Sequence, residues 1–202
     1  DEAMTVVVAA GGAADSAGNT NAVASNNFGW THDATAPTVV ITSAQVSTGG
    51  SHNGAVTLTV TFSEEMTGIS DSDFTFTNCA SSDFQTLTAN TVFTQICTPT
   101  TNGATVTIGV LAARGTDPAG NNNAAATDFT WTYDTTVPTI STVAVAGATE
   151  DGYGVASTYV VTITPSETLG AVPTLTVTGG SITTAGAASS TNYVYTVTPD
   201  SA

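Results

Sequence analysis

The sequence predicts an all-β protein built from tandem β-sandwiches. The chain repeats itself at a spacing of about 101 residues, which is the size of one small sandwich domain. Apolar residues alternate with polar residues, mainly threonine, in the period of two that is typical of strands burying one face. No stretch keeps a helical period over three turns, so the predicted core contains strands alone.

The repeat is visible in motifs that recur at a constant offset. The segment 17–22 (AGNTNA) returns at 119–124 (AGNNNA), and the segment 28–33 (FGWTHD) returns at 129–134 (FTWTYD). Aligning these motifs divides the chain into the closing strands of one unit, one complete unit and the opening strands of another. The three predicted domains are residues 1–34, 35–134 and 135–202.

The two ends of the chain match each other. When the end is joined to the beginning, six residues lie between Pro199 and Met4, and six also lie between Pro99 and Val106 in the complete unit. Two interpretations follow. Either the chain is a window on a longer polypeptide, or separate subunits complete each other's open domains by strand addition. Both predict identical or near-identical copies, arranged head to tail, as partners.

The alternation predicts short strands throughout, separated by Gly, Asn, Asp and Pro. In the segment 55–62, for example, apolar residues alternate with threonines, whose β-branched side chains suit the outer face of a sheet. About seven such strands per unit are typical of an immunoglobulin-like sandwich, with Trp30 and Trp131 as core anchors. The predicted strands cover 4–10, 28–33, 38–43, 55–62, 73–78, 91–97, 104–111, 128–133, 139–146, 157–164, 173–178 and 192–198.

Composition excludes several classes of function. Sixteen acidic residues face a single basic one, Arg114, for a net charge of −15, so the basic surface that nucleic-acid binding requires is missing. No apolar run reaches the ~20 residues of a membrane helix, so direct membrane insertion is not expected. Phosphate-binding loops, nucleophile elbows and zinc-protease motifs do not occur, and no enzymatic activity is predicted.

The two cysteines, Cys79 and Cys97, both fall in the complete unit, near or on neighbouring predicted strands. This placement predicts a disulfide and an oxidising compartment. The alternative is a pair of buried free thiols.

Several motifs of the chain resemble those of a known protein family. The stretches TDPAGNNNA, FTWTYDTTVPT and VTLTVTFSEEMTGISDSDFTFTN are similar to the tandem bacterial Ig-like repeats of very large extracellular surface proteins, adhesins and filaments. The resemblance implies a cell-surface location and a role as a stalk or scaffold module without enzymatic activity. It also implies that Ca²⁺ stiffens the joints between neighbouring units.

Acidic residues near the two linkers are candidate calcium ligands, because carboxylate and amide oxygens are the hard ligands that Ca²⁺ prefers. A fourth ligand is expected from Glu64 or Glu65, or from Glu167. The same Asp-x-Ala-Gly-Asn motif also suits a plain β-turn, in which Asp and Asn bond their own backbone. The two candidate sets are Asp15, Asn19 and Asp33, and Asp117, Asn121 and Asp134.

Short linkers, 33–38 and 134–139, each contain a proline that favours an extended, semi-rigid joint. The sequence therefore predicts a structural repeat module that transmits load and sets length. The alternative function is a ligand-binding module of the adhesin or lectin type, which usually carries long unique loops.

Overall fold

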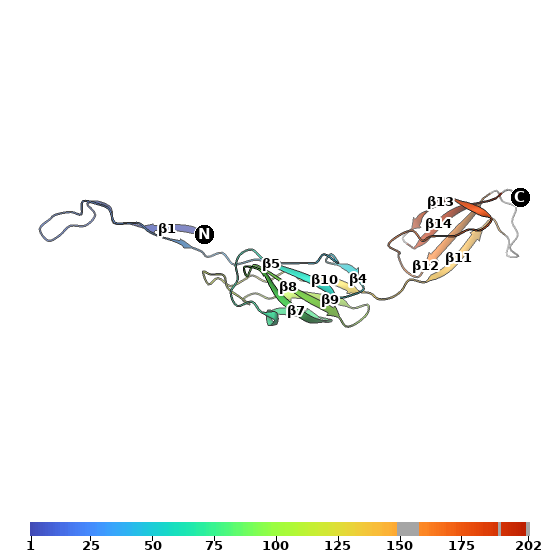
Figure 1. Cartoon of the computed structure of the whole chain (residues 1–202), viewed down its shortest axis with the longest axis horizontal. Helices are drawn as coiled ribbons and strands as arrows, with labels where there is room; N and C mark the ends of the chain where they lie inside the picture. Colours follow the sequence, from blue (N-terminus) through green and yellow to red (C-terminus); the bar gives the residue numbers. More distant parts are fainter. Residues whose placement is uncertain (149–157, 190, 201–202) are drawn as a thin grey trace. The chain divides into compact units, whose positions relative to one another are not determined.

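A computed structural model describes residues 1–148, 158–189 and 191–200. The chain divides into two compact units, Asp1–Thr135 and Thr136–Ala202, and Figure 1 labels most of their strands. Within the described ranges, no helix is long and apolar enough to cross a membrane.

The complete domain, residues 35–134, is a sandwich of two four-stranded sheets, which confirms the predicted fold class. One sheet has the order β3-β5-β8-β7 and the other the order β4-β10-β9-β6. All neighbouring strands are antiparallel except β4 and β10, which are parallel. The strands are β3 (Val39–Thr42), β4 (Gly50–His52), β5 (Val56–Phe62), β6 (Phe74–Thr77), β7 (Cys79–Thr88), β8 (Val92–Pro99), β9 (Thr105–Val110) and β10 (Phe129–Tyr133).

The core of this domain follows from the period-two pattern. In β5 the apolar residues are buried and the threonines between them face outward or are partly exposed. Val106 and Ile108 of β9 and Trp131 of β10 face them from the second sheet and are also fully buried. Trp131 is thus a core anchor, as predicted.

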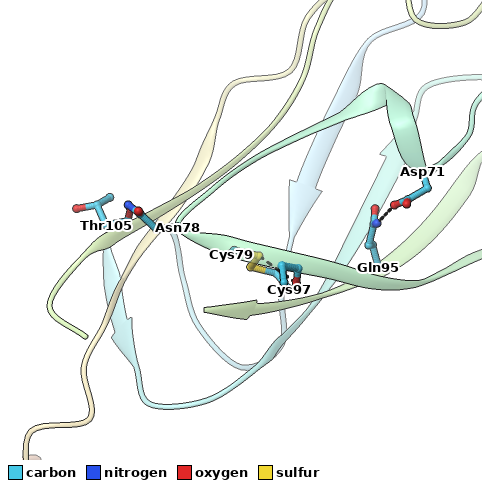
Figure 2. Close-up of a disulfide and its surroundings, with 7 residues drawn as sticks. Asp71, Asn78, Cys79, Gln95, Cys97 and Thr105 are labelled. Carbon is cyan, nitrogen blue, oxygen red and sulfur yellow. Dashed lines mark hydrogen bonds between the residues drawn. A yellow bond between two sulfur atoms is a disulfide. The ribbon is translucent and has the colours of Figure 1, made fainter. Parts of the chain in front are cut away.

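A disulfide links β7 to β8. Cys79 and Cys97 are bonded, with their Cα atoms 5.7 Å apart, which confirms the predicted pairing. Figure 2 shows the bond on these two strands. Beside it, the side-chain amide of Asn78 donates to the carbonyl of Thr105 at 2.8 Å and so ties the turn between β6 and β7 to the other sheet.

Three strands escaped sequence prediction. β4 is short and polar, and β7 and β13 (Gly180–Ser189) are rich in Ser, Thr and Ala, with β7 largely exposed. None of them shows the apolar alternation on which the prediction depends. His52, flanked by the turn-forming residues Gly50 and Asn53, lies in β4 opposite Tyr133.

Residues 1–34 form a two-stranded antiparallel hairpin of β1 (Glu2–Val6) and β2 (Phe28–His32), drawn in blue in Figure 1. Trp30 lies opposite Met4, as Trp131 lies opposite Val106 in the complete domain. Trp30 is exposed, so it anchors no core within the open hairpin, and its role as a core anchor of a completed unit stays a prediction. The hairpin has no second sheet against which this ring packs among the described residues.

The second unit contains one four-stranded sheet of order β11-β12-β14-β13, with β11 (Ile140–Ala146), β12 (Tyr159–Pro165) and β14 (Asn192–Pro199). This order matches β3-β5-β8-β7 of the complete domain. Its small core contains Val161, Ile163 and Tyr195. The predicted strand 173–178 is not a strand, because no described strand lies beside it. The start of the predicted strand 157–164 lies outside the described residues at 157.

Candidate metal centre

The loop between β9 and β10 holds Asp117 in a tight turn. Its two carboxylate oxygens accept from the backbone N–H and the side-chain amide of Asn121, each at 2.8 Å. Gly120 takes a positive φ of 96°, a conformation that side chains other than glycine rarely adopt. This geometry is the β-turn that the Asp-x-Ala-Gly-Asn motif suits, and it fixes both oxygens of Asp117 in place.

The equivalent loop in the hairpin has the same turn. The carboxylate of Asp15 accepts from the backbone N–H of Asn19 at 2.8 Å and from its side-chain amide at 2.9 Å. The side-chain bond from Asn19 is the main cause that lowers the pKa of Asp15, and its backbone bond adds to it.

Two carboxylates from other parts of the chain lie close to that of Asp117. Asp33 follows β2, Glu64 follows β5, and Asp117 lies between β9 and β10, yet one ligand oxygen from each lies within 4.8 Å of the others. The side-chain amide of Asn121 also donates to the backbone carbonyl of Asp33 at 3.2 Å. We call Asp33, Glu64 and Asp117 the joint cluster, because it connects the hairpin's linker to the complete domain.

The charges in the joint cluster act on one another. Burial raises the pKa of Glu64, and the negative charges of Asp117 and Asp33 raise it further. Burial also acts to raise the pKa of Asp117, but the hydrogen bonds from Asn121, Gly120 and Ala119 outweigh it and hold that pKa below its usual value. Asp117 therefore stays ionised beside Glu64, whose ionised form is disfavoured.

The joint cluster changes the grouping that the sequence predicted. Asp15 lies beyond one end of the β1–β2 hairpin and Asp33 beyond the other. The five-residue strands between them span roughly 16 Å, whereas Ca²⁺ binds oxygens at about 2.3–2.6 Å. Asp15 and Asp33 therefore lie too far apart to bind one ion, and the predicted set that combined them is wrong. The acid that ends one unit meets the loop acid of the domain that follows it.

The second predicted set is divided in the same way. Asp117 and Asp134 lie beyond opposite ends of the β9–β10 pair, and the backbone N–H of Asp134 donates to the carbonyl of His52 at 3.1 Å. Glu64 joins Asp33 and Asp117, whereas Glu65 accepts from the side chain of Asn90 at 3.4 Å.

Sequence reasoning named every member of the joint cluster but did not place Asp33 beside Asp117. The missing signal was the register of the hairpins, which puts loop acids and linker acids at opposite ends.

Comparison with known proteins agrees with this architecture. A family model described as Bacterial Ig-like domain matches residues 33–133, which is half of the chain. The match begins at Asp33 and ends at Tyr133, so it contains the whole sandwich and the joint cluster. No curated protein matches the chain. The chain belongs to the bacterial Ig-like domain family.

Proposed function

We propose that this chain is a structural repeat module of an extracellular bacterial filament, stalk or giant surface protein, whose units follow one another head to tail. The observation that carries the proposal is the repetition of one fold within the chain. A complete sandwich is preceded by a hairpin with the register of its own last two strands and followed by a sheet with the order of its own first sheet. Bacterial Ig-like domains are often surface-exposed and typically non-enzymatic.

The linker before the complete domain is tied to it in a way that suits load transmission. Pro37 is buried, and its carbonyl accepts from the backbone N–H of Ala124 at 2.8 Å. Four residues earlier, the carbonyl of Asp33 accepts from Asn121. Two contacts from the β9–β10 loop thus hold the linker, in addition to the φ restriction of proline.

We further propose that Ca²⁺ binds at the joint cluster. The donor set fits the ion, because three carboxylates supply hard oxygen ligands in one place and Ca²⁺ takes six to eight such ligands from side chains, carbonyls and water. A bound Ca²⁺ would remove the repulsion among the three carboxylates and so strengthen the joint. Calcium ligation by Asp134 at the following linker remains a prediction, as does ligation by Asp15 and Asn19.

A pair of adjacent substitutions tests the calcium proposal. Ca²⁺ should raise the melting temperature of the unaltered chain relative to the chain in excess EDTA, and Glu64→Gln should remove most of that increase. Glu65→Gln is the matched control, since it removes the same charge one residue outside the joint cluster. Equal melting temperatures with Ca²⁺ and with EDTA would sink the proposal, and the acids would then be turn residues only.

The location and the head-to-tail arrangement need native material. Antibodies against the complete domain should label intact cells or filaments in electron micrographs, and labelling only after lysis would contradict an extracellular role. Denaturing electrophoresis separates the two arrangements: a band near 20.1 kDa, the mass of this chain, supports separate subunits, and a much larger band supports a continuous polypeptide. Label confined to filament tips would favour the ligand-binding alternative.

A further inference from the structure

The β1–β2 hairpin exposes side chains that the complete domain buries. Phe28 and Phe129 occupy equivalent positions in their hairpins, opposite Val6 and Ile108, yet Phe28 is 68 % exposed and Phe129 is 6 % exposed. Trp30 is 43 % exposed, whereas Trp131 is 1 % exposed. The hairpin therefore carries the inner face of a sandwich without the sheet that would cover it.

The second unit exposes apolar side chains of the other sheet of the sandwich, the sheet that would face such a hairpin. Val39 of β3, which lines a pocket together with Phe129 of β10, is 7 % exposed. Ile140 of β11 stands at the position equivalent to Val39, because each pairs with the last residue of the next strand, and it is 50 % exposed. Val143 of β11 is exposed as well. Among the described residues of the second unit, none takes the place of β10.

A third observation fixes where the missing strands would lie. Asn78 and Gly179 both have positive φ values, and their carbonyls accept from the N–H groups of Thr100 and Asp200, each at 3.0 Å. Residues 175–178 are therefore equivalent to β6. In the complete domain β6 pairs with β9, whereas 175–178 have no described strand beside them. Leu175 and Val177 nevertheless pack on the core of the second unit.

We infer that the hairpin of a second copy of this chain covers the open sheet of the second unit and adds its β1 strand, antiparallel, to residues 175–178. The inference rests on the proposed head-to-tail module and specifies its interface. The occupant is a second copy because residues 1–34 carry β1 and β2, which pair in the register of β9 and β10. In the complete domain, β9 and β10 belong to the sheet that covers β3-β5-β8-β7, the counterpart of the second unit's sheet. By the pairing of β6 with β9, the register is Val8 opposite Leu175, Val6 opposite Val177 and Thr5 opposite Thr178.

Two forces set the strength of this interface. Apolar side chains on both faces leave water, as Phe129 and Trp131 do in the complete domain. Each copy carries a net charge of −15, so copies repel each other at a distance and salt screens that repulsion. Association should therefore strengthen with ionic strength.

Cysteine cross-linking in the full chain tests the register. Thr5 and Thr178 are exposed, and directly opposed residues in an antiparallel pair have Cα atoms about 4.5–5.5 Å apart, within disulfide range. The variant Thr5→Cys/Thr178→Cys should form covalent dimers and longer oligomers on mild oxidation, with the new bond mapped by mass spectrometry. Thr5→Cys/Thr174→Cys is the matched control, because four residues displace the pair by roughly 13 Å.

Oligomers that form from Thr5→Cys/Thr178→Cys but not from Thr5→Cys/Thr174→Cys support the inference. Equal cross-linking of both variants overturns the register, a cross-link within single chains overturns the second copy as occupant, and no cross-link in either variant overturns the interface. The extracellular module itself would stand in all three failures, since surface labelling tests it independently.

A substitution on the exposed face supplies a second readout. Trp30→Ser should weaken self-association about 10-fold or more in sedimentation velocity, because it removes an aromatic anchor of the interface. The fold of the complete domain should not change, since Trp30 packs only on the neighbouring ring of Phe28 among its aromatic contacts. Leu87→Ser, which alters an exposed residue of β7, should leave association unchanged. Equal association of all three chains would overturn the inference.

Discussion

Two carboxyl groups a few ångströms apart respond to the fold in opposite directions. Hydrogen bonds from Asn121 and its neighbours hold the pKa of Asp117 below its usual value in spite of burial. Burial raises the pKa of Glu64 instead, and the negative charges of Asp117 and Asp33 raise it further. The contrast shows that the joint cluster stabilises one charge with its own turn and leaves another in need of a cation or a proton.

The sign of the pH dependence follows from these shifts. Because the folded pKa of Glu64 lies above its unfolded value, ionised Glu64 destabilises the fold, and stability is regained as the pH falls through the raised pKa. In EDTA, Glu64→Gln should therefore raise the melting temperature above that pKa and have little effect below about pH 4. A melting series against pH measures this. An increase confined to acidic pH would contradict it.

Asp117 has the reverse dependence. Its lowered pKa contributes stability above the unfolded value, and that contribution is lost as the pH falls through the folded pKa. Asn121→Ala removes both side-chain contacts of Asn121 with the cluster, so it should raise the pKa of Asp117 and lower the melting temperature at neutral pH. Asn19→Ala, at the same place in the exposed hairpin loop, is the matched control for the complete domain. Carboxyl chemical shifts measured against pH would contradict the prediction if the Asp117 titration did not move.

For single residues, the sequence predicted local conformation better than it predicted which distant residues lie together. The motif around Asp117 predicted its turn, because Asp, Gly and Asn have well-defined local preferences. That Asp33 lies beside Glu64 depends instead on how three loops meet, and no local pattern encodes that.

Among the secondary-structure elements, the covalent link between β7 and β8 offers a clear test. Replacing both cysteines (Cys79→Ala/Cys97→Ala) should lower the free energy of unfolding by about 3 kcal/mol, the effect expected for a short closed loop. Urea unfolding measures it. Reduction of the unaltered chain is the control and should produce a similar loss; if reduction has no effect, the variant is destabilised by lost packing around Cys97 instead.

The paired tryptophans test how much each hairpin depends on its surroundings. Trp131→Ala should cost the complete domain about 3–5 kcal/mol, because it opens a cavity in a closed core. Trp30→Ala, the same change in the open hairpin, should leave the unfolding of that domain unchanged in dilute solution. Equal losses from the two changes would mean that the open hairpin contributes to the domain's stability.

Strands with one apolar face were predictable and strands without one were not. β5 and β9 alternate apolar and polar residues cleanly, and β8 alternates in burial although Gln95 lies on its buried face; all three were predicted with their ends correct to about two residues. β7 and β13 are polar edge strands whose pairing with β8 and β14 is set by hairpin connection, so hydrophobic periodicity missed them. The segment 173–178 has the right pattern, but a strand also needs a partner.

For the whole molecule, the same fold occurs once closed and once open, and the two states should melt differently. The complete domain has two sheets, a disulfide and a full core, whereas the described part of the second unit has one sheet and a small core. Calorimetry should therefore resolve two transitions, with the second unit unfolding at the lower temperature.

Only the lower transition should depend on chain concentration. A second copy that binds the folded sheet stabilises it by mass action, by about 2.7 kcal/mol at a free concentration 100 times the dissociation constant, and it adds nothing to a domain already closed. Raising the salt concentration should shift the same transition upward, since screening lets two chains of charge −15 approach. Trp30→Ser should abolish both shifts while leaving the upper transition in place. Transitions that move together with concentration, or do not move at all, would show that the open sheet is not completed by another copy.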